Sequence, residues 1–292
     1  MSLSLGQKAG WGLADMGIVV FVIVKQLLIL AFMNSFLGIP IALAGAVTTA
    51  VLIFDIITDP IIGYFSDKTV SRFGRRSPWM LLGAVVLALA MIGIFAVPEN
   101  FTPNASLVWV IVFFLISTLG FTMVSIPYGA MAGEMTLDKK ERSSMTAWRM
   151  AFASLGILIG GALIPILAGD TKSGYTFAAI CVAPLIILSI WFSVFFTRNA
   201  PRTLVPSQQN FSYILKLVFA NRAFVTLVIL YGIMTLAIAL ITAGLPFAAM
   251  YLIMDDGNSL LSGVAKGLGT LSLMFACLLY TSDAADEVDR GV

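Results

Sequence analysis

Long runs of hydrophobic residues, separated by short polar segments, cover most of the chain. A helix needs roughly 20 predominantly apolar residues to cross a bilayer. Seven runs reach this length, and an eighth begins near Gly263 and stops short. The runs are continuous rather than alternating, which favours helices over a β-barrel. The pattern therefore predicts an all-α membrane protein with spans at about 11–36, 41–65, 79–97, 107–128, 145–168, 175–196 and 223–254.

The composition supports a membrane protein and excludes several functional classes. Hydrophobic residues make up 60% of the 292 residues and charged residues 11%, whereas soluble proteins carry about 25% charged residues. A disordered chain would need a low apolar fraction, and a nucleic-acid-binding chain a strong basic excess. This chain has neither, because its net charge is only +2. The chain has no histidine, which excludes Ser-His-Asp and Cys-His catalysis. We therefore expect no enzyme activity, no cofactor and no nucleic-acid partner.

Basic residues gather in alternate loops between the predicted spans. Lysine and arginine concentrate in the cytoplasmic loops of membrane proteins. Lys172 is the exception here, because it lies in a loop on the other side. A cytoplasmic amino terminus is predicted by Lys8, Lys68, Arg72, Arg75, Arg76, Lys139, Lys140, Arg142, Arg198, Arg202, Lys216 and Arg222.

The longest polar segment between spans predicts a division into two parts. Six spans, a cytoplasmic linker and further spans are the plan of a transporter with two six-helix halves. An ordinary loop in a seven-helix protein is the alternative, although a retinal protein would need a lysine in the seventh span, and 223–254 has none. We expect an N-terminal six-helix bundle over residues 1–197 and a central cytoplasmic loop over 198–222. The start of a C-terminal bundle, helix VII and part of helix VIII, would follow over 223–276.

The last residues do not continue the hydrophobic pattern. The string Leu278–Glu287 resembles the in-frame translation of a transposase sequencing adapter, and its charges are costly in a membrane helix. We therefore expect residues 277–292 to be a non-native tail, the C-terminal bundle to be truncated, and the chain by itself not to transport. A natural acidic tail after a half-span is the alternative.

Two carboxylates interrupt the second predicted span, where Asp55 and Asp59 lie on either side of Thr58 and before a proline. Ionisable residues inside membrane helices are costly and functional by default. The i, i+4 spacing places both carboxylates on one face of a helix. Such a pair can hold a proton, or a monovalent cation between two ionised oxygens. A structural ion pair with Lys25 or Arg149 is compatible with either role.

A segment rich in glycine and arginine connects the second and third spans. Its spacing resembles the cytoplasmic signature of the major facilitator superfamily, which implies the fold of that superfamily. Gly63 is expected to allow close helix approach, and Asp67 is expected to pair with arginines in a contact that breaks during transport. A basic loop without a gating role is the alternative. The predicted gating motif consists of Gly63, Asp67, Arg72, Gly74, Arg75 and Arg76.

The motifs together resemble one family within that superfamily. The run 55–63, the loop 72–78, Ile126-Pro127-Tyr128 and the segment 136–142 are similar to the glycoside–pentoside–hexuronide:cation symporters, and the likeness covers residues 5–276. The resemblance implies a multi-pass protein of the bacterial inner membrane, in contact with the lipid bilayer, that carries a sugar together with H⁺ or Na⁺. A non-sugar or lipid-like substrate, or a non-transporting sensor, is the alternative.

The resemblance also implies cation ligands. Asp55 and Asp59 are the expected ligands, as metal ligands if the cation is Na⁺, and Thr122 matches a further family ligand. Thr58 occupies the position of a family asparagine that is tied to Na⁺ use. The cation therefore stays open, with H⁺ favoured.

The sugar site is implied less completely, because most of the family's galactoside contacts are absent. Arg149 aligns with an arginine that contacts sugar, and Ser125 stands where the family has an aspartate. The first span adds Asp15 and Lys25. Lys25 either binds an anionic substrate, such as a uronate, together with Arg149, or is the counter-ion of the carboxylate pair. Trp148 can stack on a sugar ring or anchor the helix at the interface.

Overall fold

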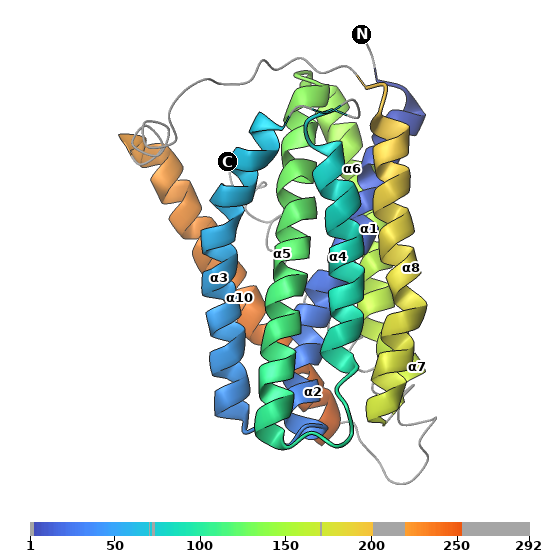
Figure 1. The fold of residues 1–292 in the computed structure, drawn as a ribbon. Helices are drawn as coiled ribbons and strands as arrows, with labels where there is room; N and C mark the ends of the chain where they lie inside the picture. The colour runs from blue at the N-terminus through green and yellow to red at the C-terminus, as the bar shows by residue number, and fades with distance from the viewer. Residues whose placement is uncertain (1–2, 70, 72–73, 170, 201–219, 253–292) are drawn as a thin grey trace.

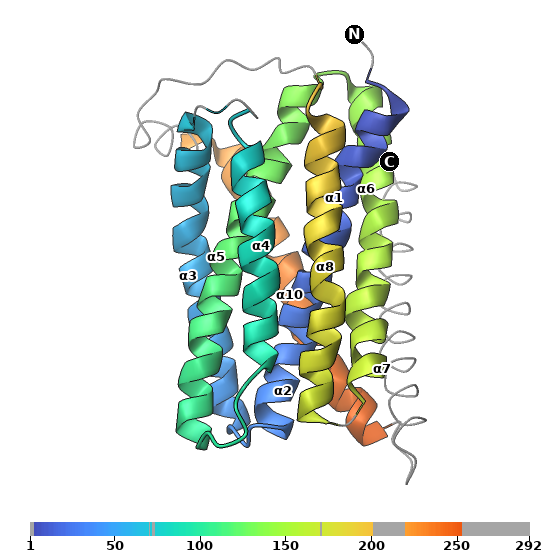
Figure 2. The same ribbon diagram turned by 45° about the vertical axis from the view of Figure 1, so that its right-hand side comes forward.

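The computed structural model describes residues 3–69, 71, 74–169, 171–200 and 220–252. Within these ranges the regular structure is helical, and most of the helices run side by side along one axis (Figures 1 and 2). The elements are α1 (Leu5–Ile23), η1 (Val24–Leu28), α2 (Ile29–Ser35), α3 (Ile41–Lys68), α4 (Ser77–Phe95), α5 (Pro103–Met135), α6 (Lys139–Leu158), η2 (Ile159–Leu163), α7 (Ile164–Ala168), α8 (Lys172–Thr197) and α10 (Arg222–Leu252).

The first six predicted spans are confirmed as helices long and apolar enough to cross a membrane. Two of them contain a short π-helical turn: η1 joins α1 to α2, and η2 joins α6 to α7. The seventh predicted span is the helix α10. The predicted eighth span, the tail over 277–292 and most of the central loop lie outside the described residues.

Helix starts lie several residues earlier than hydrophobicity alone predicted, because polar side chains cap them. The Thr102 hydroxyl accepts a hydrogen bond from the Ala105 amide at 3.4 Å, so α5 begins at Pro103 rather than near residue 107. The Asp138 carboxylate accepts from the Lys140 amide at 2.9 Å, so α6 begins at Lys139 rather than near residue 145. Such caps satisfy amide donors that the first helical turn leaves free.

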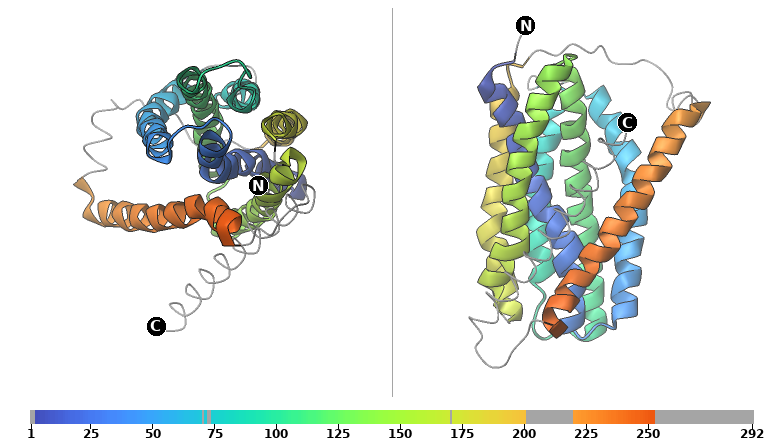
Figure 3. Two further views of the ribbon diagram at one scale, coloured as in Figure 1. Left: turned by 90° about the horizontal axis from the view of Figure 1, so that it is seen from below. Right: turned by 180° about the vertical axis from the view of Figure 1, so that it is seen from behind.

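The first span forms the centre of the bundle. α1 packs against α6 on one side and α8 on another, while α4 packs against α5 and α8, and α3 packs against α5. The side chains of Ala14 and Phe21 in α1 are fully buried. Figure 3 shows α10 crossing the side of the bundle opposite α4 at a slant to the other helices.

Small residues allow the closest helix contacts. A Cβ added at Gly120 of α5 would lie 2.6 Å from the backbone nitrogen of Leu87 in α4, and one added at Gly83 of α4 would lie 2.8 Å from the Cβ of Met123 in α5. Membrane helices associate through such small-residue contacts because lipid offers no hydrophobic driving force between helices. The register of α4 against α5 is therefore fixed by these two glycines.

One end of the bundle carries most of the described basic residues. The amino terminus, the ends of α3, α5 and α8, and the starts of α4 and α6 meet at this end (Figure 1). We call it the basic end. It contains Lys8, Lys68, Arg75, Arg76, Lys139, Lys140, Arg142 and Arg198, whereas Lys172 lies at the opposite end.

Candidate functional site

Three spans converge on the carboxylate of Asp55. Lys25 Nζ in η1 donates to Asp55 Oδ2 at 2.9 Å, and the Thr122 hydroxyl on α5 lies 3.0 Å from Asp55 Oδ1 and 3.1 Å from the carbonyl oxygen of Thr118. Lys25 lies in the π-helical turn, a local insertion that is frequent at functional sites. Both oxygens of Asp55 therefore lie within hydrogen-bond distance of a donor group on another helix.

Asp59 lies one helical turn further along α3. It interacts electrostatically with both Asp55 and Lys25, and its Oδ1 is buried without a hydrogen-bond partner among the described residues. A buried carboxylate oxygen without a partner is costly. The two carboxylates thus interact with each other and with Lys25, which is paired with Asp55, and one oxygen of Asp59 is left for a proton or cation.

Thr58 is oriented differently from these two aspartates. Its side chain is buried, and its hydroxyl lies 3.0 Å from the carbonyl oxygen of Phe54 and 3.1 Å from that of Asp55. The hydroxyl proton is thus used within α3 itself. Among the described residues, no group of three or more His, Cys, Asp or Glu side chains gathers as a metal site.

A second ionic contact joins α1 to α6. Arg149 Nε donates to Asp15 Oδ2 at 3.0 Å, and Asp15 is 3% exposed. The close approach depends on Gly12, because a Cβ there would lie 2.8 Å from the backbone nitrogen of Arg149. The other carboxylate oxygen of Asp15, Oδ1, is buried and has no hydrogen-bond partner within the described part of the chain.

Two aromatic residues complete this second cluster, although neither was predicted as a site residue. The rings of Trp11 and Tyr128 stack with centroids 4.8 Å apart, and Trp11 Nε1 donates to the Tyr128 carbonyl at 3.3 Å. The Arg149 guanidinium lies 5.7 Å from the centroid of the Tyr128 ring. The Tyr128 hydroxyl is buried without a described partner. Their positions near span ends are typical of interfacial anchors, so the sequence pattern hides their contact with each other.

The remaining two predicted sugar contacts are less closely tied to these clusters. Trp148 is 36% exposed, and its ring stacks on that of Phe152 at 6.2 Å, one turn further along α6. Ser125 on α5 is half-buried, and no hydrogen bond joins it to another described residue. The structure thus brings Asp15 next to Arg149 and Lys25 next to Asp55, as two separate pairs.

The predicted gating motif forms a charge network at the basic end. Arg76 Nη2 lies 2.8 Å from Asp67 Oδ1 and 3.4 Å from Glu134 Oε1, and Arg75 is also paired with Glu134. Glu134 is 4% exposed. Sequence reasoning missed it, although a glutamate near the end of a long apolar run is the signal that would have found it.

The two glycines of the motif differ in importance. A Cβ at Gly63 would meet the Ile126 side chain at 3.5 Å, an ordinary contact, so the expected need for glycine in close helix approach is wrong there. Gly74 adopts φ +96°, which favours glycine, and its amide donates to the Ser71 carbonyl at 3.0 Å in the turn before α4. Arg72 lies outside the described residues.

Comparison with known proteins decides the family. A family model described as MFS/sugar transport protein matches residues 10–281. The chain belongs to this family. The MFS/sugar transport family accounts for the helical membrane fold and agrees with the resemblance found in the sequence motifs.

Curated relatives of this MFS/sugar transport chain include named symporters. It is 30% identical over 225 residues to the putative glycoside/cation symporter YagG of Escherichia coli, covering 75% of this chain and 48% of YagG. It is also 30% identical over 239 residues to the uncharacterized symporter YjmB of Bacillus subtilis, covering 78% of this chain and 51% of YjmB. The chain thus spans about half the length of these relatives.

A solved structure shares the fold of this MFS/sugar transport chain. The crystal structure of a D-xylose-proton symporter matches with a TM-score of 0.52 at 13% identity, covering 96% of this chain and 69% of the other. At this identity the likeness shows the common fold alone. The chain is a multi-pass membrane protein with the arrangement of a major facilitator superfamily transporter.

Proposed function

We propose that the protein acts as a secondary active symporter that couples movement of a sugar to movement of a monovalent cation across the bacterial plasma membrane. The observation that carries the proposal is the convergence of Lys25, Asp55 and Thr122 from three spans, beside Asp59. Ionisable groups inside membrane helices mark ion and substrate pathways. The name of the relative YagG, a putative glycoside/cation symporter, supports the same activity.

The cation binds at Asp55 and Asp59 in this proposal. Lys25 is the counter-ion of the pair while the cation is absent, because its ammonium contacts Asp55 and interacts electrostatically with Asp59. Thr122 orients one oxygen of Asp55. Na⁺ would need several oxygen ligands, whereas a proton needs one carboxylate oxygen. Thr58 stands where the family has an asparagine that is tied to Na⁺ use, and this difference favours H⁺ over Na⁺.

The sugar binds between the two bundles, beside the pair formed by Asp15 and Arg149. Lys25 and Arg149 each contact a carboxylate, so neither is a free cation for an acidic substrate. The three carboxylates at these two sites carry one more charge than the two cationic side chains Lys25 and Arg149. One bound monovalent cation would therefore bring the net charge of the two sites to zero. This balance supports a neutral glycoside or pentoside over a hexuronide, with Ser125 and Trp148 as additional contacts.

Coupling follows from linkage between the two sites. A cation that neutralises Asp55 and Asp59 lowers the cost of closing the site around the substrate, and each ligand then favours binding of the other by the same factor. The halves rock to open the other side of the membrane. The network of Asp67, Arg76 and Glu134 joins α3, α5 and the start of α4 at the basic end, which faces the cytoplasm in the orientation predicted from the loops, and its contacts break as the halves rock.

Gradient-driven uptake of labelled sugars tests the proposal. Because the chain spans about half of its relatives, uptake is measured in cells that express the complete natural gene containing these residues. We expect Asp55→Asn and Asp59→Asn to abolish accumulation against a gradient. Glu99→Gln, which removes one carboxylate from an exposed loop outside the spans, is the matched control and should transport normally.

Two outcomes would contradict the proposal. Normal accumulation by the double variant Asp55→Asn/Asp59→Asn would exclude these carboxylates from coupling. If the unaltered protein is present in the membrane at normal abundance and takes up none of the sugars tested, it would instead be a sensor or a carrier of a non-sugar or lipid-like substrate. Uptake that responds to pH but not to Na⁺ would assign H⁺ as the coupling cation.

A further inference from the structure

A cavity opens between α4 and α8 near the basic end. It has a volume of about 790 Å³ and is lined by residues of both helices and of the turn before α4. Ligand sites in proteins typically enclose about 300–1,000 Å³. It is separate from the carboxylate sites, which involve α1, α3, α5 and α6. A ligand in this cavity would therefore not be the transported sugar.

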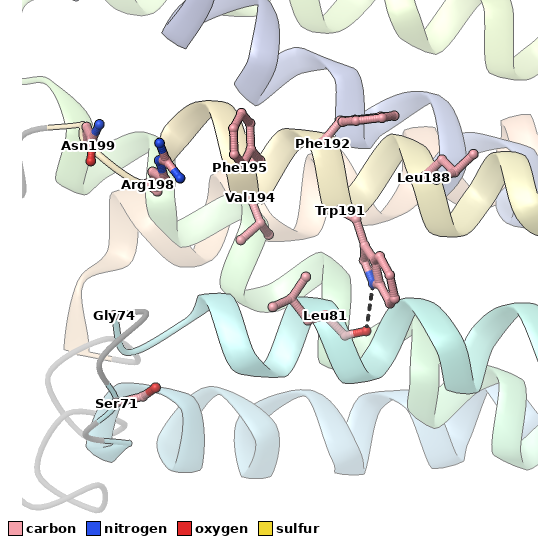
Figure 4. A pocket seen from close by; sticks show the side chains of 10 residues that line it. All are labelled: Ser71, Gly74, Leu81, Leu188, Trp191, Phe192, Val194, Phe195, Arg198 and Asn199. Carbon is pink, nitrogen blue, oxygen red and sulfur yellow. Dashed lines mark hydrogen bonds between the residues drawn. The ribbon is translucent and has the colours of Figure 1, made fainter.

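The wall along the membrane-spanning part of the cavity is apolar and aromatic. Trp191 points from α8 toward α4, where its Nε1 donates to the carbonyl of Leu81 at 3.1 Å (Figure 4). Leu188, Phe192 and Phe195 also line the cavity, and each is about half exposed in the described structure. Trp191 thus ties the two helices together, and hydrocarbon can lie along the remaining surface.

The other end of the cavity is polar and positively charged. Arg198 and Asn199 follow the end of α8, opposite Ser71 and the turn at Gly74 (Figure 4). The Arg198 guanidinium lies over the Phe195 ring at 4.4 Å. No carboxylate among the described residues forms an ion pair with it, in contrast to Arg75 and Arg76. Arg198 is thus positioned to bind the anionic group of a ligand.

The described part of the chain leaves this face open. α10 crosses the opposite side of the bundle (Figure 3), and its helix contacts are with η1 and α2. In a protein whose helices span the membrane, the face formed by α4 and α8 lies in the bilayer. An apolar groove that ends in a cation at the level of the basic loops matches the two chemical parts of a phospholipid.

We propose that the cavity between α4 and α8 is a binding site for one anionic phospholipid of the cytoplasmic leaflet. Its phosphate binds Arg198, and an acyl chain lies along Leu188, Trp191 and Phe192. Charge complementarity selects an anionic headgroup, because a basic side chain near the membrane surface attracts anionic lipid. The proposal does not depend on the transported substrate or on the coupling cation.

Retention of lipid by the purified chain tests this site. The protein in mild detergent is mixed with equal amounts of phosphatidylglycerol and phosphatidylcholine of the same acyl chains, and bound lipid is counted by native mass spectrometry. We expect selective retention of phosphatidylglycerol, lowered about fivefold in Arg198→Gln, as for loss of one basic residue near the membrane surface. Arg198→Lys should retain most of the selectivity, because it keeps the charge.

A second variant and a charge control keep the test decisive. Leu188→Trp fills the apolar part without altering charge and should also lower retention, whereas Lys139→Gln removes one basic charge from the same end outside the cavity and should not. Inorganic phosphate should not displace the lipid, because it lacks an acyl chain. Circular dichroism checks that each variant is folded.

Three outcomes would overturn the proposal. Equal retention of the two lipids, or equal loss in Arg198→Gln and Lys139→Gln, would show diffuse attraction in place of a site. Displacement by inorganic phosphate would show an anion site without a lipid. A dimer that forms without lipid and is disrupted by Leu188→Trp would show that a second copy of the chain covers the groove.

Discussion

Lys25 and Asp55 form an ion pair between the first and second spans, with Nζ 2.9 Å from Oδ2 and side-chain exposures of 11% and 16%. Both charged groups are largely removed from water, so each is stabilised mainly by the opposite charge of its partner. Removing one partner of such a pair leaves the remaining charge without compensation in a low-dielectric environment. The contact therefore links the stability of the protein to the state of the carboxylate pair.

A double-mutant cycle tests this coupling. We expect Lys25→Gln and Asp55→Asn each to lower the free energy of unfolding by about 2 kcal/mol, less than the 3–5 kcal/mol of a fully buried pair because both side chains are partly accessible. The double variant should lose less than the sum of the two, as expected for residues in contact. Thermal unfolding in detergent measures the three values. Strictly additive losses would mean that the pair does not compensate its charges.

The sugar proposal predicts a specific role for the geometry of Arg149. Its Nε donates to the buried Asp15 at 3.0 Å, and a lysine has no group in that position. We expect Arg149→Lys to weaken sugar binding about tenfold, the value of roughly one charge-assisted hydrogen bond, while cation binding is kept. Equilibrium binding of labelled sugar measures this with the complete natural gene product.

Arg142→Lys is the matched control for Arg149→Lys, because Arg142 lies on the same helix but near the basic end. It should bind sugar normally. If Arg149→Lys binds sugar as tightly as the unaltered protein, the pair of Asp15 and Arg149 would be structural and would not contact the substrate.

The sequence was sufficient for the membrane class and the position of the spans, because hydrophobic runs of this length have one stable arrangement in a bilayer. It also marked Asp55 and Lys25 as unusual, because each is a charge within an apolar run. It offered Lys25 as the counter-ion of the carboxylate pair only as one of two alternatives, and it could not say which aspartate Lys25 or Thr122 would reach, because these contacts depend on how three spans pack around each other. The direction of the Thr58 hydroxyl was equally inaccessible, because it depends on a rotamer within α3.

At the basic end, too, the charged residues could be recognised in the sequence, but the way in which they pair could not. Asp67 and the arginines before α4 are conspicuous in the sequence. Glu134, the carboxylate that both Arg75 and Arg76 share, lies 58 residues beyond Arg76. It is buried there only because α5 continues to Met135. Its role thus depends on the register of α5 against α4, where the two close-contact glycines lie, and on the packing of α5 against α3.

Glu134 is predicted to contribute more to stability than Asp67. Glu134 is buried and paired with both Arg75 and Arg76, whereas the Asp67 side chain is 55% exposed and, among the described residues, forms an ion pair with Arg76. We expect Glu134→Gln to lower the free energy of unfolding by about 2–3 kcal/mol and Asp67→Asn by less than about 1 kcal/mol. Chemical unfolding in detergent compares the two. Equal losses would place both carboxylates in the same environment, contrary to the structure.

The close contact of α4 with α5 gives a prediction that is independent of function. A Cβ at Gly120 would lie 2.6 Å from the Leu87 nitrogen and 2.9 Å from its Cα, and this backbone can shift only if the helices separate. We expect Gly120→Ala to lower the unfolding temperature, with a loss of about 1–3 kcal/mol as for other overpacked contacts. For Gly129, on the same helix, no described atom beyond its own helix backbone lies within 4 Å of an added Cβ. Gly129→Ala should therefore be neutral or stabilising by up to about 1 kcal/mol, because alanine favours the helix. A Gly120→Ala variant as stable as Gly129→Ala would show that α4 and α5 do not approach each other as closely as the structure indicates.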